Sequence, residues 1–243
     1  MTLQLEFEPC ARQAAQELQD CGLVQAFGGL VAQVWRQNLD RQDVEAGDTY
    51  WTLAMLSAAN IKEVALRPSA EGGLVGHDAR WSVDKDRSSL RFRTTAGDVR
   101  AMKLPAVGGG RLPDWNAIDW EGAQLRREIA LRNSRRIQLV SREVGLEPLV
   151  GVEMPRPTGG ALEFMIGWTG DSRSPLTFGY LFIPVLGAQP ALCPVPLWTD
   201  EPSGRGADVV EALQDERLPY DEVSVTEAPL RLKPRPGREA RGE

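Results

Sequence analysis

The sequence predicts an α+β protein, in which an N-terminal helical unit precedes a small antiparallel sheet, a basic helix, a C-terminal hairpin and a disordered tail. Three observations lead to this prediction. Apolar residues recur every three to four positions near the N-terminus, as on one face of a helix. Short alternating runs separated by turn residues follow, which is typical of antiparallel strands. Charge is also sorted: residues 64–142 hold 15 Lys and Arg against 9 Asp and Glu, a net +6, whereas the whole chain has −6.

The helical unit is expected to span residues 1–60. Pro9 suits the first turn of its first helix, and Gly22 ends that helix. A second amphipathic pattern runs to Leu39 despite Gly28 and Gly29. Because each glycine costs about 1 kcal/mol in a helix relative to alanine, we expect a close approach of another element there.

A third helix is expected before residue 60, capped by Asp48 or Thr49. Tryptophans on predicted elements are assigned to the core, as are two cysteines facing the helices. The tryptophans are Trp35, Trp51, Trp81 and Trp168, and the cysteines are Cys10 and Cys21.

An α+β core is expected over residues 61–199. Its first strands are predicted at 61–67, 80–85, 89–94 and 99–104. On the third of them, Arg91 and Arg93 share one face while Leu90 and Phe92 share the other. The turn at Asp84–Asp86 is interpreted as a solvated hairpin tip.

The second half of this core contains a basic helix and a hairpin. The helix is predicted over residues 119–143, with a strand as the alternative for residues 135–144, and the hairpin is predicted over 161–168 and 176–185. Four prolines (Pro184, Pro190, Pro194 and Pro196) are expected to prevent regular structure up to Trp198. Residues 200–226 form an acidic segment with a short helix, and 227–243 a disordered basic tail.

Side chains able to do chemistry are few and scattered. His77 is the only histidine, and no nucleophile motif or zinc-protease motif accompanies it. Three cysteines without a CxxC pair do not predict a zinc site or a disulfide framework. The sequence therefore predicts no catalytic residue, no metal site and no cofactor, and it favours a protein without catalytic activity.

Location follows from what the chain lacks. No run approaches 18 apolar residues, and the first residues lack the basic and apolar regions of a signal peptide. We expect a cytoplasmic protein without a membrane partner.

The leading hypothesis is a non-catalytic interaction or assembly subunit, which binds a protein partner or itself through charge-segregated surfaces. Amphipathic rings near loops are the predicted contacts: Trp115, Trp120 and Trp198. An alternative is a nucleic-acid-binding protein whose arginines neutralise phosphates. Those arginines are Arg91, Arg93, Arg126, Arg127, Arg135 and Arg136. A further alternative is an enzyme of unrecognised type.

Overall fold

The structure is a computed structural model that describes residues 2–74, 80–87, 89–95, 97–143 and 162–199. The chain divides into two units, Met1–Glu201 and Pro202–Glu243, and every described residue belongs to the first. His77, the acidic segment and the basic tail lie outside the described residues.

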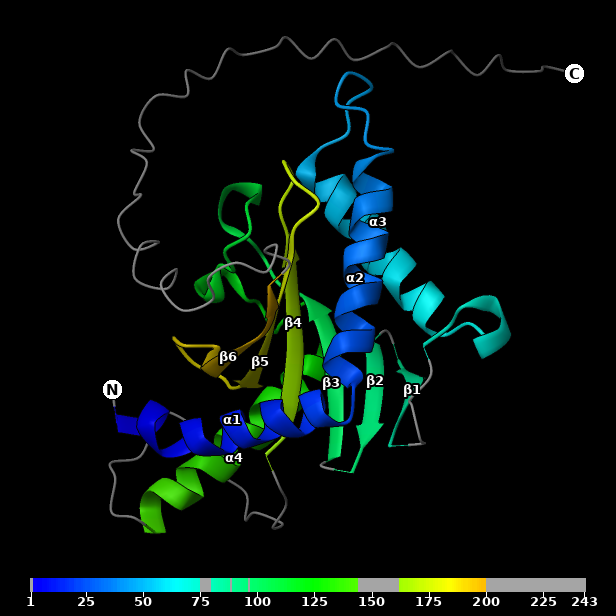
Figure 1. Ribbon diagram of the computed structural model, residues 1–243. Coiled ribbons are helices and arrows are strands. Elements are labelled where there is room, and N and C mark those ends of the chain that lie inside the picture. Colours follow the sequence, from blue (N-terminus) through cyan, green and yellow to red (C-terminus); the bar gives the residue numbers. More distant parts are fainter. Residues whose placement is uncertain (1, 75–79, 88, 96, 144–161, 200–243) are drawn as a thin grey trace, which may run out of the picture. The chain divides into compact units, whose positions relative to one another are not determined.

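Within the described residues the first unit contains four α-helices and a six-stranded sheet, which confirms the α+β prediction (Figure 1). The helices are α1 (Thr2–Asp20), α2 (Leu23–Leu39), α3 (Tyr50–Ala65) and α4 (Gln124–Glu143). The strands are β1 (Trp81–Asp86), β2 (Ser89–Thr94), β3 (Gly97–Lys103), β4 (Phe164–Gly170), β5 (Thr177–Pro184) and β6 (Ala191–Thr199).

The strands lie in their order along the chain, from β1 to β6. Neighbouring strands are antiparallel except β3 and β4, which are parallel. A parallel pair needs a long crossover connection, and α4 lies in the one between these strands. The predicted meander and the predicted hairpin therefore belong to one sheet.

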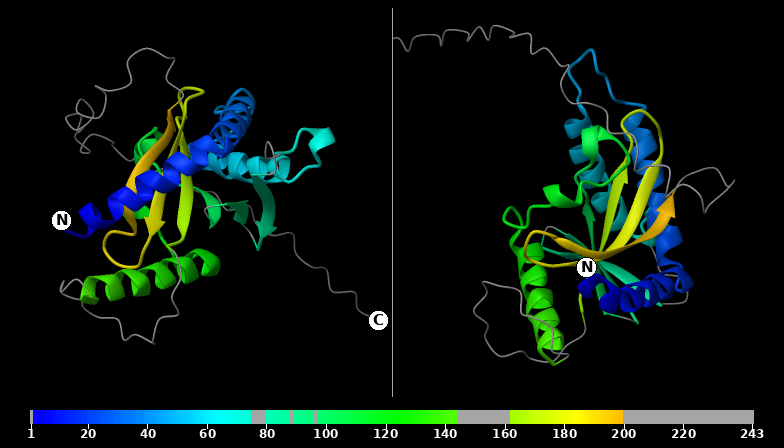
Figure 2. Two further views of the ribbon diagram at one scale, coloured as in Figure 1. Left: turned by 60° about the horizontal axis from the view of Figure 1, so that its bottom comes forward. Right: turned by 90° about the vertical axis from the view of Figure 1, so that its left-hand side faces the viewer.

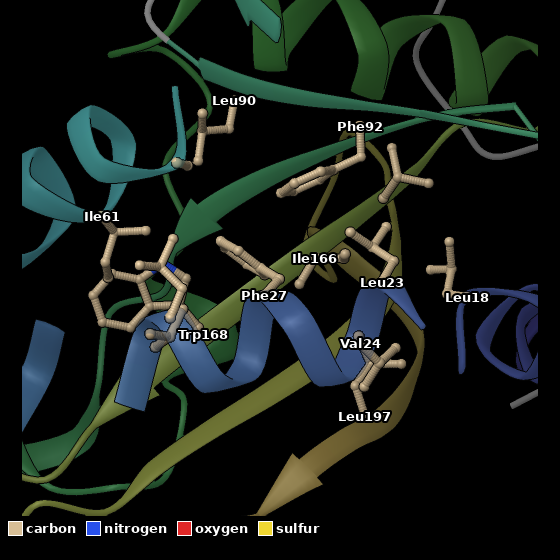
Figure 3. Packing of buried hydrophobic residues seen from close by; sticks show 14 of the residues in the cluster. Leu18, Leu23, Val24, Phe27, Ile61, Leu90, Phe92, Ile166, Trp168 and Leu197 are labelled. Atoms are coloured by element: carbon tan, nitrogen blue, oxygen red, sulfur yellow. The ribbon is translucent and has the colours of Figure 1, made fainter. Parts of the chain in front are cut away.

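Helices cover both faces of this sheet. Helices α1, α2 and α3 lie on one face and α4 on the other (Figure 2). Leu90 and Phe92 of β2 point toward the three N-terminal helices, where they pack with Phe27 of α2 (Figure 3). Met165 of β4 and Phe182 of β5 point the other way, toward α4. The alternation predicted for residues 89–94 is confirmed.

Helix α3 is longer than the sequence suggested. Thr49 caps it, as one of the two predicted residues, through a capping box with Thr52. The predicted strand at 61–67 is wrong, because the helix continues to Ala65. Ile61 extends the buried side of the helix one turn beyond Ser57. A short apolar run does not by itself distinguish a strand from a buried helical segment.

Two proline predictions are also wrong. Pro9 lies inside α1, which begins at Thr2 rather than near the proline. Pro194 and Pro196 lie within β6, where the sequence predicted irregular chain. Strand β6 is an edge strand, and a proline on an edge strand removes an N–H that need not pair within the sheet.

The close approach predicted at Gly28 and Gly29 is confirmed for Gly28. The indole of Trp198 on β6 lies against Gly28, where an added Cβ would be 3.1 Å from the ring. Gly29 has open space around it. Gly179 of β5 approaches the same indole so closely that a Cβ would overlap it. Small residues on two elements thus make room for one large ring.

Candidate functional site: the exposed side of α3 and a cationic pocket

One side of α3 presents apolar residues to solvent. Trp51 is 68% exposed and Met55, one turn later, is 56% exposed. Ala58 and Lys62 continue this row at helical spacing, and we call these four residues the α3 stripe. The assignment of Trp51 to the core is therefore wrong. The buried side of the helix passes through Leu53 and Ile61 instead, so the ring of Trp51 points away from the sheet.

A pocket of about 240 Å³ opens beside the α3 stripe. Met55, Ala58 and Lys62 of the stripe form part of its lining with Ala59 and Ile61 of the same helix, and the rest comes from α2, the strands and α4. Its apolar walls are Phe27, Ile61, Leu90, Ala101, Met102 and Trp168. Figure 3 shows four of these side chains, Phe27, Ile61, Leu90 and Trp168, on the helical face of the sheet.

Three cationic side chains reach this pocket from three different elements: Lys62 of α3, Lys103 at the end of β3 and Arg126 in the first turn of α4. No Asp or Glu is among the described residues that line it. We call it the cationic pocket. Its positive charge arises only when the chain folds, since the three residues are far apart in the sequence.

Lys103 lies in an aromatic cage. Its Nζ donates hydrogen bonds to Tyr50 Oη at 2.8 Å and to the Leu104 carbonyl at 3.2 Å. The rings of Tyr50, Trp168 and Trp35 have their centroids 4.9, 5.5 and 6.0 Å from Nζ, within cation–π range. Burial lowers the pKa of Lys103 to about 8, and burial together with Asp171 raises the pKa of Tyr50 to about 12. At neutral pH the ammonium is therefore the charged donor and the phenol is neutral.

Arg126 is also a desolvated cation. Burial lowers its pKa, and within the described part of the chain no carboxylate forms an ion pair with it. The next residue differs: Arg127 is mostly exposed and pairs with Glu121 at 3.0 Å. Neighbouring arginines on α4 thus have opposite surroundings, one facing a pocket and one facing solvent.

The arginines predicted to bind nucleic acid do not form one open patch. Arg91 contacts Asp84 at 2.8 Å and Arg93 contacts the same carboxylate at 2.7 Å. Arg136 lies 3.4 Å from Glu163, and one nitrogen of the half-buried Arg135 has no hydrogen-bond partner. The structure brings Arg91 and Arg93 together, but it places Arg126 at the cationic pocket and Arg127 beside Glu121. A phosphate at most of these positions has to compete with a carboxylate already in contact, so binding to nucleic acid stays a prediction.

The acids that pair with these arginines form a network on the α4 face of the sheet. Arg100 of β3, whose side chain is only 8% exposed, contacts Asp86 at 2.7 Å and Glu163 at 3.5 Å. Arg132 of α4 contacts Glu163 from the other side at 2.6 Å. The interpretation of Asp84–Asp86 as a solvated hairpin tip is wrong, because both aspartates lie on β1 and face arginines of β2 and β3. These arginine partners lower the pKa of both aspartates.

The tryptophans predicted to contact a partner have roles in packing. Trp120 is buried and donates from Nε1 to the Val185 carbonyl at 2.9 Å. Trp115 is half-buried and packs edge-to-face on Tyr180 and Phe182. Trp198 lies between α2 and β5, as described above. That any of the three binds a partner stays a prediction.

Two of the three cysteines, Cys10 and Cys193, have a raised pKa, which disfavours the reactive thiolate. Burial raises the pKa of Cys193 to about 11, and Glu8 adds to this effect. Cys10 is exposed rather than in the helical core, so its core assignment is wrong, whereas Cys21 is buried as predicted. In the described ranges no three His, Cys, Asp or Glu side chains come close enough together to hold a metal ion.

No protein-family model, curated protein or solved structure matches the chain. Among the helices that the structure describes, none combines the length and the apolar character needed to cross a membrane.

Sequence reasoning missed both parts of this site. The α3 stripe has the 4-3-4 spacing of residues on one side of a helix. This spacing, beside that of the buried residues of the same helix, could have indicated a second apolar side. Lys103 offered no comparable pattern. A lysine at the end of an alternating strand usually points to solvent, and only the packing of α2 and α3 around it produces the aromatic cage.

Proposed function

We propose that this chain is a non-catalytic interaction protein that binds a partner protein along the α3 stripe. The observation that carries the proposal is the exposure of Trp51 and Met55, one turn apart, on a helix whose opposite side is buried. Tryptophan contributes more than its share of binding energy at protein interfaces, because a large ring excludes water from its neighbours. Exposing it in the free protein costs solvation free energy that a partner would recover.

The surroundings of the stripe indicate the chemistry of the partner. Apolar residues at its N-terminal end favour an apolar face, such as one side of an amphipathic helix. Lys62 and the cationic pocket at its other end favour acidic groups at the edge of that face. We therefore propose a partner segment that is apolar with acidic residues beside it. The proposal includes the cytoplasmic location expected from the sequence.

The described residues support binding more than catalysis. The buried thiol of Cys193 is protonated at neutral pH, and the amine of Lys103 is held by Tyr50 and a carbonyl. Neither arrangement presents a free nucleophile beside a general base, which covalent catalysis needs.

The test is site-specific photo-crosslinking in the organism that produces the protein. A benzophenone amino acid at position 51 is expected to yield a discrete protein adduct. The same amino acid at Arg12, an exposed position on α1, is the matched control and is expected to yield none. Adding Met55→Asp should abolish the adduct at position 51, because a carboxylate placed in the apolar row repels the partner face.

Light scattering on the purified chain then shows whether the partner is a second copy. An adduct at twice the mass together with a concentration-dependent dimer identifies self-association. Equal labelling at positions 51 and 12, or an adduct that Met55→Asp leaves unchanged, contradicts the proposal.

A further inference from the structure

The cationic pocket combines two properties that rarely occur together, partly desolvated positive charge and apolar walls. Lys103 and Arg126 have both lost water on folding, and no carboxylate of the described residues pairs with either. Lys103 is held only by the neutral Tyr50 hydroxyl, the Leu104 carbonyl and aromatic rings. A cation taken out of water without an opposite charge is costly, and an incoming anion recovers part of that cost. The pocket is therefore more complementary to an anion than to a neutral ligand.

The walls determine what the anion must carry. Leu90 and Trp168 line the pocket together with Phe27 and Ile61, so most of the ligand surface would meet carbon atoms. A volume of about 240 Å³ lies below the roughly 300–1,000 Å³ of pockets for drug-sized ligands, so the pocket suits a small ligand. Inorganic anions, which lack an apolar part, leave these walls uncovered.

An anion loses water when it enters the pocket, and the cost of that loss favours one kind of anion over another. A singly charged carboxylate loses less hydration on entering an apolar pocket than a doubly charged phosphate. The planar fork of the Arg126 guanidinium matches the two oxygens of a carboxylate, and Lys103 adds a point charge.

We propose that the cationic pocket binds a carboxylate attached to a short apolar body. The carboxylate comes either from a free organic acid or from an acidic side chain flanked by apolar residues. This inference goes beyond the proposed function, since a pocket for an organic acid needs no partner on the α3 stripe.

The first arm of the test uses hexanoate, which has eight non-hydrogen atoms, followed by titration calorimetry at pH 7. We expect a dissociation constant on the order of 1 mM, as befits so small a ligand. Hexan-1-ol and hexylammonium, which share the apolar chain but lack the negative charge, should bind at least tenfold more weakly. Hexanol binding as tightly as hexanoate would overturn the inference, and so would the absence of any hexanoate heat at 20 mM.

Two variants of adjacent residues provide the matched comparison. Arg126→Gln should weaken hexanoate binding at least fivefold, because it removes a cation that lines the pocket. Arg127→Gln removes the same charge from the same helix outside the pocket and should leave binding unchanged. Thermal unfolding of both variants checks that they fold. If both substitutions weaken binding equally, hexanoate responds only to the net charge of the protein and not to a cation in the pocket, which contradicts the inference.

The pH dependence of hexanoate binding tests the role of Lys103 independently. The ammonium of Lys103 loses its proton above about pH 8, so hexanoate binding should weaken from pH 7 to pH 9. Lys103→Met should bind more weakly at pH 7 and lose this pH dependence. A pH profile identical in the wild type and in Lys103→Met contradicts a role for the caged lysine.

The second arm separates the two sources of the carboxylate. It uses a capped peptide with one glutamate between leucines, Ac-Leu-Leu-Glu-Leu-Leu-NH₂, and its glutamine counterpart. If the glutamate peptide binds more tightly than hexanoate and Trp51→Ala weakens it, the source is an acidic side chain of a protein partner. If hexanoate binds and the peptide does not, the source is a free organic acid. In the latter case the pocket stands whether or not the crosslinking at position 51 succeeds.

Discussion

Two glycines, Gly170 and Gly29, differ in the space available for a side chain. Gly170 ends β4 against the ring of Trp35, and an added Cβ would overlap the indole. That indole is fully buried and donates from Nε1 to the Asp171 carbonyl at 3.0 Å, so it has little freedom to move. Gly29, in the interior of α2, has no atom near the position of its missing Cβ.

The two alanine substitutions should therefore have opposite effects. Gly170→Ala overpacks a rigid site and should lower the free energy of unfolding by about 1–3 kcal/mol. Gly29→Ala replaces a helix-interior glycine in open space and should raise it by about 0.5–1 kcal/mol. Urea denaturation followed by tryptophan fluorescence measures both. Effects of the same sign would contradict this account of the packing.

At the scale of elements, the first three strands depend on cross-strand charge. Arg91 of β2 lies directly opposite Arg100 of β3, an arrangement that is unfavourable for two like charges. Carboxylates on either side resolve it: Asp84 contacts Arg91 from β1, and Asp86 and Glu163 contact Arg100. The two arginines are therefore tolerated side by side only because β1 and the residue before β4 place carboxylates next to them.

Removing the buried member of this network should be costly. Arg100→Met leaves Asp86 and Glu163 partly buried with one fewer cation to accept hydrogen bonds from, and should lower the free energy of unfolding by about 1–3 kcal/mol. Arg93→Gln is the matched control, since Arg93 is 57% exposed and its pair with Asp84 should contribute only about 0–1 kcal/mol. Chemical denaturation at pH 7 compares them, and an equal loss in both variants would contradict the proposed importance of burial.

The same network predicts the response to acid. Arginine partners lower the pKa of Asp84, Asp86 and Glu163 in the folded state. A carboxyl group with a lowered folded pKa stabilises the fold above its ordinary pKa, and this contribution is lost as the pH falls through the folded value. Stability should therefore fall below about pH 4, and it should fall less steeply in Arg100→Met.

At the scale of the whole molecule, several arginines of the basic middle of the sequence are paired with carboxylates. The sequence shows a net +6 over residues 64–142, and several of its arginines pair with Asp84, Asp86 and Glu121 in the same stretch. Glu163, from just beyond it, pairs with further arginines. A count of arginines along the sequence therefore overstates how many can contact a polyanion without displacing a carboxylate.

The pairing of these arginines with carboxylates disfavours the nucleic-acid alternative. We expect no mobility shift with single- or double-stranded DNA or with RNA at 50 mM salt and micromolar protein, because phosphates would have to displace carboxylates from the arginines. A shift that weakens steeply with added salt would contradict this expectation. Loss of that shift in Arg91→Ala/Arg93→Ala, with Arg12→Ala unaffected, would establish the alternative.

Periodicity predicted much of the fold, since it reflects local geometry. The alternation at residues 89–94 and the helical spacing in α2 require only that one face of each element be buried. The same reasoning failed where one pattern fits two structures, as at Ile61 in α3. It also failed where a proline is tolerated because its strand lies at an edge, as at Pro194 in β6.

Residue types and their spacing were enough to predict the α+β class, most of its elements and the sorting of charge. Tertiary structure alone decided which side of α3 is exposed and which arginines find a carboxylate. It also assembled Lys62, Lys103 and Arg126 around one pocket. Burial and pairing depend on distances between residues remote in the chain, and local patterns in the sequence carry no information about those distances.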